Sequence, residues 1–108
     1  MKGMLSATNN PLGRTIHTIP VEKLQNSYPG KMVVLTEVKA SIKAVGLLNP
    51  LLVLPEVDGI YKIHVGNNRF LAARKLGYTA IDCYIAEPDD DLKYLDKFFK
   101  MKPEDFPR

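Results

Sequence analysis

The sequence predicts an α+β fold in which helices flank a small mixed β-sheet. Apolar and polar residues alternate over 61–65 and 79–85, which is typical of half-buried strands. Apolar residues recur every three or four positions over 35–45 and 70–76, which indicates amphipathic helices. The nearly continuous apolar run over 47–54 predicts a strand covered on both faces, so helices must pack on the sheet.

The N-terminal quarter is predicted to contain little regular structure. Residues 1–14 show no periodicity and contain an Asn-Asn-Pro-Leu-Gly stretch, so we expect a flexible arm. A short strand follows over 15–19, and Pro20 begins a helical turn over 20–24. Residues 25–31 are predicted to form a loop.

The middle of the chain is predicted to alternate between helix and strand. A helix of about three turns buries Leu35, Val38, Ile42 and Val45, and Gly46 ends it. Lys39 and Lys43 fall on its other face, which is either simply solvated or in contact with phosphates. The apolar strand is entered in extended form because of Asn49-Pro50. Residues 55–59 then form a hairpin turn.

A strand, a glycine turn and a helix follow over 61–77, and the helix ends before Gly77. Asn67 and Asn68 are residue types that cap helix N-termini. A helix that begins directly after Gly66 exposes backbone N–H groups and the positive end of its dipole. An anion can bind there, and Arg69 in the first turn can hold it.

The C-terminal part is predicted to close the sheet and then leave it. The strand over 79–85 completes the domain, which spans 15–86. Residues 87–108 form an acidic linker followed by a helix that begins at Leu92 and packs on or extends the domain. Adjacent Phe98 and Phe99 do not both fit one narrow apolar stripe, so one is available for a partner.

Composition indicates one basic domain in a reducing compartment. The chain has 108 residues, a net charge of +3 and one cysteine, Cys83, which favours the cytoplasm and a buried thiol. No run of 18 apolar residues and no apolar leader is seen, so neither a membrane helix nor a signal peptide is predicted. Residues 1–86 carry ten Lys/Arg and five Asp/Glu, which weakly favours polyanionic partners.

Two segments resemble the ParB/sulfiredoxin superfamily. The run from Gly66 to Gly77, Gly-Asn-Asn-Arg-Phe-Leu-Ala-Ala-Arg-Lys-Leu-Gly, is similar to that family's Gly-Glu-Arg-Arg-x-Arg-Ala motif. The run over 41–53 is similar to its Ser-Ile-x-x-x-Gly-Leu-x-Gln-Pro-Leu-x-Val segment. The resemblance covers about residues 15–86 and implies a stand-alone ParB N-terminal-like domain that binds nucleotide phosphates at the glycine turn.

The chain departs from the family motif where chemistry is expected. Family members carry glutamate or a reactive cysteine directly after the glycine, and this chain carries Asn67. An amide neither holds a metal well nor acts as a base or nucleophile. Asn68 and Leu71 also depart from the motif, whereas Gly66 and Arg69 are kept. We therefore expect binding without nucleotide turnover and assign no catalytic residue.

The expected ligand residues form two groups. The phosphate or nucleotide group comprises Gly66, Asn67, Asn68, Arg69 and Lys31, and the nucleic-acid group comprises Arg74, Lys75, Lys39 and Lys43. Lys31 lies in a second family loop and is either a point charge for a phosphate or an ordinary surface lysine. No cofactor is assigned, although a nucleotide with Mg²⁺ is one candidate. No metal site is predicted, because His17 and His64 lack ligand spacing.

Three functions stay open from the sequence. The first is a DNA-associated or regulatory accessory protein that binds a nucleotide or nucleic acid. The second is a metal-dependent ParB-like nuclease. The third is an interaction module with a vestigial pocket, whose C-terminal helix binds a protein partner or a second copy.

Overall fold

The computed structural model describes residues 2–27 and 36–95. In chain order the elements are β1 (Lys2–Leu5), β2 (His17–Pro20), the 3-10 helix η1 (Val21–Lys23), β3 (Leu24–Gln25), α1 (Thr36–Val45), β4 (Leu51–Val53), β5 (Tyr61–Val65), α2 (Asn67–Lys75) and β6 (Tyr78–Ile85). A further helical turn begins at Leu92. No helix in the described ranges is long and apolar enough to span a membrane.

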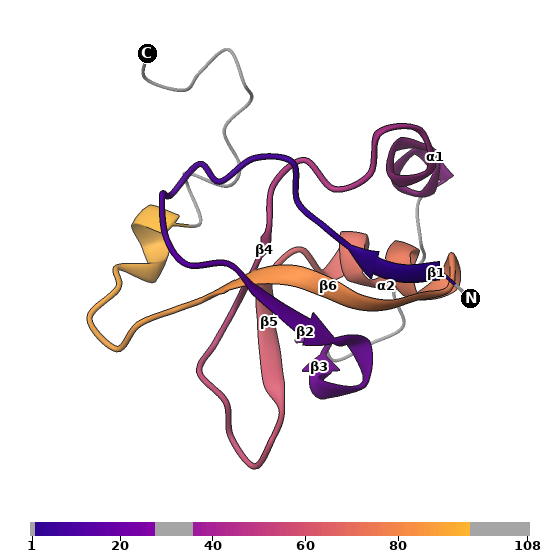
Figure 1. Cartoon of the computed structure of the whole chain (residues 1–108). Coiled ribbons are helices and arrows are strands. Elements are labelled where there is room, and N and C mark those ends of the chain that lie inside the picture. Colours follow the sequence, from indigo (N-terminus) through magenta and orange to yellow (C-terminus); the bar gives the residue numbers. More distant parts are fainter. Residues whose placement is uncertain (1, 28–35, 96–108) are drawn as a thin grey trace.

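The six strands form one mixed sheet with β6 at its centre. β1 pairs in parallel with the first half of β6, and β4 pairs in parallel with its second half. β2 pairs antiparallel with β6 along the opposite edge. β4 continues through an antiparallel hairpin to β5, which pairs in parallel with β3 (Figure 1). The predicted α+β class with a small mixed sheet is confirmed.

The N-terminal residues are not the flexible arm that the sequence suggested. β1 lies in the sheet, where Leu5 is paired with Ile81 and is buried. The backbone N–H of Ala7 donates to Asp82 at 2.9 Å, and the Thr18 hydroxyl donates to the same carboxylate at 2.7 Å. The strand forms because the exposed edge of β6 supplies backbone partners, although residues 2–5 carry no alternating pattern of their own.

Each sheet face has its own apolar core. Both α1 and α2 cover one face, where Ile42 and Phe70 pack in the same cluster as Leu51, Val53 and Ile63. The other face is covered by residues 12–16 and by the helical turn at 92–95. There the members that pack together are Leu52, Tyr84, Ala86, Leu95, Leu12, Ile16, Leu54, Val65 and Leu92. Since successive β4 residues belong to opposite clusters, the predicted burial on both faces is confirmed, although the strand spans Leu51–Val53 and not the whole apolar run over 47–54.

The hairpin between β4 and β5 turns at Asp58-Gly59. Both residues have positive φ, 53° and 81°, as a two-residue type I′ turn requires, and Val57 bridges to Ile60. α1 agrees with its predicted range, although Val45 is 55% exposed rather than buried. Leu35 lies outside the described residues.

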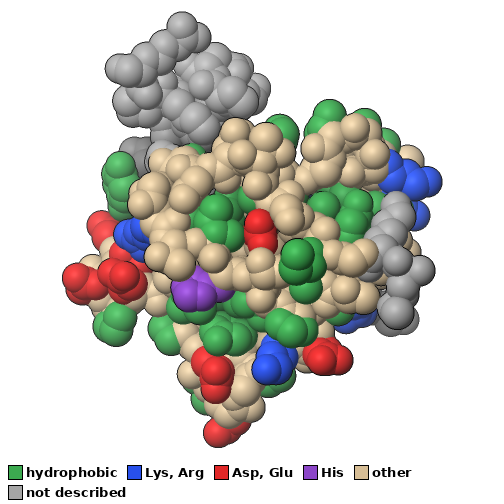
Figure 2. Space-filling view, in the orientation of Figure 1, with side chains coloured by type: hydrophobic (Ala, Val, Ile, Leu, Met, Phe, Trp, Pro, Cys, Tyr) green, Lys and Arg blue, Asp and Glu red, His purple; other side chains and the backbone are tan. Residues whose placement is uncertain are grey.

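Charge is unevenly distributed over the visible surface. Figure 2 shows acidic side chains over the β4–β5 hairpin and over the turn that follows β6, and basic side chains beside α1 at the opposite edge of this face. The lysines on α1 are Lys39, which is partly buried, and Lys43, which is exposed. On this face, one group of basic side chains therefore lies beside α1.

Candidate functional site

The turn from β5 into α2 is built around Gly66. This residue occupies the N-cap position with a left-handed φ of 113°, which a residue with a side chain rarely adopts. A Cβ placed there would lie 2.5 Å from Cδ2 of Leu51, so the backbone runs directly over a buried strand residue. Only glycine fits this approach without displacement of its neighbours.

The first turn of α2 presents open backbone donors. The first intrahelical bond is donated by the N–H of Phe70 to the carbonyl of Gly66 at 2.9 Å. The three preceding N–H groups have no acceptor within the helix, and among the described residues no side chain caps them. The expectation that Asn67 or Asn68 caps the helix is therefore wrong, because both residues lie inside its first turn. The open donors and the helix dipole together favour an anion at this end.

Arg69 is the cation beside these donors. Its Nη1 donates to the backbone carbonyl of Asn49 at 2.8 Å, which orients the guanidinium between α2 and the entrance of β4. Within residues 2–27 and 36–95, no carboxylate lies at ion-pair distance from it. Burial lowers the pKa of the Arg69 guanidinium, because the charged form loses hydration. A partly buried cation without a carboxylate is a natural partner for an anionic ligand.

A cavity of about 410 Å³ opens beside Arg69, between α1 and the loop that precedes β4. Its lining is mostly apolar, and the polar side chains come from α1, from this loop and from α2. The lining residues are Glu37, Val38, Ser41, Ile42, Gly46, Leu47, Leu48, Asn49 and Arg69. The volume is within the usual range of small-molecule sites, and the mixture of an apolar wall with a few polar groups is typical of them.

Asn67 has a different role from the one expected. Its side chain is 6% exposed and is held by Ser27, 40 residues earlier in the chain. The Asn67 Oδ1 accepts from the backbone N–H of Ser27 at 3.0 Å, and its Nδ2 donates to the Ser27 hydroxyl at 3.0 Å. Asn67 therefore fastens the segment after β3 to the start of α2. Only its backbone N–H is left as a candidate phosphate donor.

The other candidate residues are spread over the two helices. Asn68 is partly buried in the first turn of α2, next to the open donors. Arg74 and Lys75 are exposed in its last turn, about two helical turns away, where the Arg74 guanidinium stacks over the Phe70 ring at 5.4 Å. Lys39 and Lys43 belong to α1, as described above. Lys31 lies outside the described residues, as do Phe98 and Phe99.

Cys83 does not supply the missing nucleophile. Its side chain is fully buried on β6. Burial raises the pKa of the Cys83 thiol to about 12, and nearby Asp82 also raises it, whereas Arg69 lowers it in part. The reactive thiolate is therefore not populated near neutral pH. The prediction of a buried core thiol is confirmed.

The donor set near Arg69 does not suit a divalent cation. Magnesium takes oxygen ligands and is usually bound by one or two carboxylates together with ligand phosphates. The Asn67 oxygen already accepts from Ser27, and among the described residues Glu37, exposed in the first turn of α1, is the one carboxylate that lines the cavity. The described residues around the cavity therefore fit a magnesium–nucleotide complex poorly.

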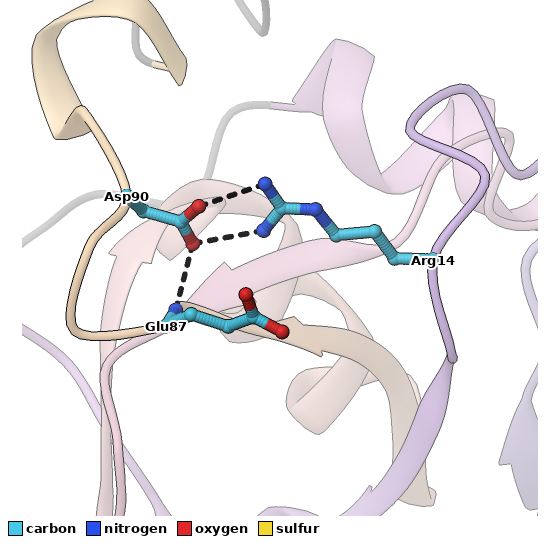
Figure 3. A network of polar contacts seen from close by, with 3 residues as sticks. All are labelled: Arg14, Glu87 and Asp90. Carbon is cyan, nitrogen blue, oxygen red and sulfur yellow. Dashed lines mark hydrogen bonds and ion pairs between the residues drawn. The ribbon is translucent and has the colours of Figure 1, made fainter.

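The acidic group after β6 is also engaged in structure. Among the described residues, Glu87, Asp89 and Asp90 are the one group whose oxygens lie close enough to share a cation. Asp90, however, accepts two hydrogen bonds from Arg14, at 2.7 and 2.8 Å, and a third from the backbone N–H of Glu87 (Figure 3). This pair ties the N-terminal segment to the turn after β6, on the far side of the sheet from α1 in Figure 1.

Three parts of the site were not found by sequence reasoning. The Asn49 carbonyl orients Arg69, Ser27 holds Asn67, and Glu37 lines the cavity. Of these three residues, only Asn49 lies in a segment with a local sequence pattern. That pattern, Asn49-Pro50, indicates an extended backbone and does not predict a contact with Arg69. Pairs separated by 20 and 40 residues leave no periodic pattern in the sequence.

Comparison with solved structures shows the same fold in two kinds of protein. Sulfiredoxin from Arabidopsis thaliana matches with a TM-score of 0.56 and 28% identity, over 82% of this chain and 100% of that chain. C-terminally truncated chromosome-partitioning protein ParB from Caulobacter crescentus, complexed with CTP-γ-S, matches with a TM-score of 0.62 and 25% identity. The match covers 82% of this chain and 56% of that chain.

The same ParB complexed to the centromeric parS site matches with a TM-score of 0.53 and 28% identity, over 68% of this chain and 40% of that chain. This chain thus spans about half the length of the ParB structures that it matches. No curated protein sequence matches significantly. The ParB N-terminal domain family matches residues 6–97. Since that range is most of the chain, this protein belongs to the ParB N-terminal domain family.

Proposed function

We propose that this protein is a ParB-like module that binds the phosphate groups of a nucleotide or nucleic acid at the β5–α2 turn. It would act as a DNA-associated or regulatory accessory protein and would not turn the nucleotide over. The observation that carries the proposal is Arg69, a partly buried cation with no carboxylate partner among the described residues. It faces a 410 Å³ cavity next to the uncapped start of α2.

Two kinds of donor converge at this place. The backbone N–H groups of the first helical turn supply short-range hydrogen bonds, and the Arg69 guanidinium supplies both charge and a forked set of donors. The apolar cavity wall can bury the uncharged part of an organic phosphate. The ParB relative complexed with CTP-γ-S makes a nucleoside triphosphate the first ligand to test.

A nucleic-acid ligand is supported by the positions of the basic residues. Lys43, Arg74 and Lys75 are exposed on the two helices that cover one sheet face. A ParB relative is complexed to the parS site, although this chain covers only 40% of the length of that relative. Contacts of this kind depend on charge, so binding to DNA should weaken steeply as salt is raised.

The absence of turnover follows from the chemistry at position 67. Asn67 is an amide engaged by Ser27, and Cys83 is buried with its pKa raised to about 12. Neither residue can serve as a base or nucleophile near neutral pH. The nuclease alternative is less well supported, because among the described residues one carboxylate, Glu37, lines the cavity beside Arg69.

The test is a calorimetric titration of the protein with CTP, ATP and GTP. Arg69→Ala should weaken binding by about 1.5–3 kcal/mol, which is the size of a hydrogen bond to a charged group. Arg74→Ala removes the same side chain from the other end of α2 and should leave nucleotide affinity unchanged. Equal affinity in the wild type and Arg69→Ala would refute the site, and phosphate release by the wild type would refute the absence of turnover.

A further inference from the structure

We infer that the β5–α2 site binds its phosphate ligand without a divalent cation, and that the neutral amide of Asn67 decides this. The inference rests on the proposed function, because it concerns the form in which the same ligand binds. It predicts that magnesium does not assist binding and instead competes with the protein for the phosphates.

The Asn67 side chain is buried and already hydrogen-bonded. Both polar atoms of the amide are paired with Ser27 at 3.0 Å, and the side chain is 6% exposed. The Oδ1 therefore already accepts one hydrogen bond in a buried position, and the neutral amide has no charge with which to attract a cation. The first residue of α2 therefore adds no charge to the site, and its side-chain oxygen is buried against Ser27.

The charges around the ligand position favour a free anion over its magnesium complex. The Arg69 side chain is positively charged, and the N-terminal end of α2 carries the positive end of the helix dipole. Asn67 and Asn68, the first two residues of the helix, are neutral. A free triphosphate or pyrophosphate carries the complementary negative charge. Its magnesium complex carries two fewer negative charges and places a cation close to Arg69, so the protein should attract it less.

Among the described lining residues, Glu37 is the one that could favour a bound cation. It lines the same cavity from α1, and it is exposed. A single solvated carboxylate, without a second acid from the described residues, binds a hard cation weakly. Its carboxylate instead repels a free anion, so its removal should strengthen metal-free binding.

The test measures the affinity of the wild type for CTP and for inorganic pyrophosphate by calorimetry, in EDTA and in excess MgCl₂. Ionic strength is matched with NaCl so that screening is equal in both buffers. We expect an affinity in EDTA that is higher than that in magnesium, by up to about tenfold, because the magnesium complex loses charge attraction to the site. Equal affinity in the two buffers would contradict the competition.

Asn67→Asp is the matched variant, because it has nearly the same shape and both Ser27 contacts can persist. The Ser27 N–H and hydroxyl can each donate to a carboxylate oxygen. The added negative charge should weaken binding in EDTA about 10- to 30-fold, as expected for repulsion between like charges in a partly buried site. Magnesium should restore part of this loss in the variant only, and Glu37→Gln should bind in EDTA at least as well as the wild type.

The outcomes separate this inference from the proposal on which it rests. Wild-type binding that requires magnesium would overturn the inference and leave the proposed function intact. Loss of magnesium-dependent binding in Glu37→Gln would overturn it as well, by identifying Glu37 as the metal ligand. Failure of the folded wild type to bind either probe in both buffers would refute the proposed function and the inference together. The wild-type comparison does not depend on whether any variant folds.

Discussion

Replacement of Gly66 by alanine tests the geometry on which the site depends. Gly66 has a φ of 113°, and an L-residue held in left-handed backbone loses about 1–2 kcal/mol. The new Cβ would also lie 2.5 Å from Cδ2 of Leu51 and 3.2 Å from Nη2 of Arg69. Leu51 is fully buried, so relief of the contact requires overpacking of the core, which costs about 1–3 kcal/mol. Together we expect Gly66→Ala to lower the free energy of unfolding by about 2–5 kcal/mol.

Gly77→Ala is the matched control for backbone strain alone. Gly77 follows the other end of α2 with a φ of 94°, and a Cβ there would meet no atom within 4 Å. Its cost should stay near about 1–2 kcal/mol. Urea unfolding followed by circular dichroism gives both values, with equal m-values required for a valid comparison. The reasoning is refuted if Gly66→Ala is no more destabilising than Gly77→Ala.

Two further predictions concern residues away from the cavity. Arg14 lowers the pKa of Asp90 below its ordinary 3.8, so this pair stabilises the fold above that pH and loses its contribution as the pH falls through the lowered value. Arg14→Ala should therefore cost about 0.5–1 kcal/mol at pH 7 and progressively less as the pH falls below 3.8, in urea titrations across that range. A cost that does not change with pH would contradict the assignment. Cys83, with its pKa raised to about 12, should resist a thiol-specific reagent at pH 8 until urea unfolds the protein. Rapid labelling of the native protein would show that the thiol is accessible.

Several elements could be predicted because their signals are local. The Asp58-Gly59 turn, the alternation over 61–65 and the apolar spacing in α2 each lie within a few residues of one another. Each signal reflects a backbone preference or a side-chain period that a short segment expresses by itself. The positions of β5 and α2, the glycine turn between them and the place of Arg69 in the first helical turn were accordingly found from the sequence.

The N-terminal strand and the role of Asn67 could not be predicted in this way. Residues 2–5 form β1 because they pair with the edge of β6, and no sequence pattern within that segment predicts a strand. Asn67 is of a residue type that often caps helices, yet its amide is hydrogen-bonded to Ser27, and Gly66 occupies the N-cap position. Tertiary partners replaced the local preference, because a buried amide is most stable where both of its polar atoms are paired.

The sequence by itself determined the α+β class, the glycine turn and the presence of a cation beside it. Only the tertiary structure decided what that cation faces. Arg69 meets the Asn49 carbonyl, and the cavity beside them is assembled from α1, the loop before β4 and the first turn of α2. The shape and charge of this site depend on segments far apart in the chain, which are brought together by burial of apolar surface and not by local propensity.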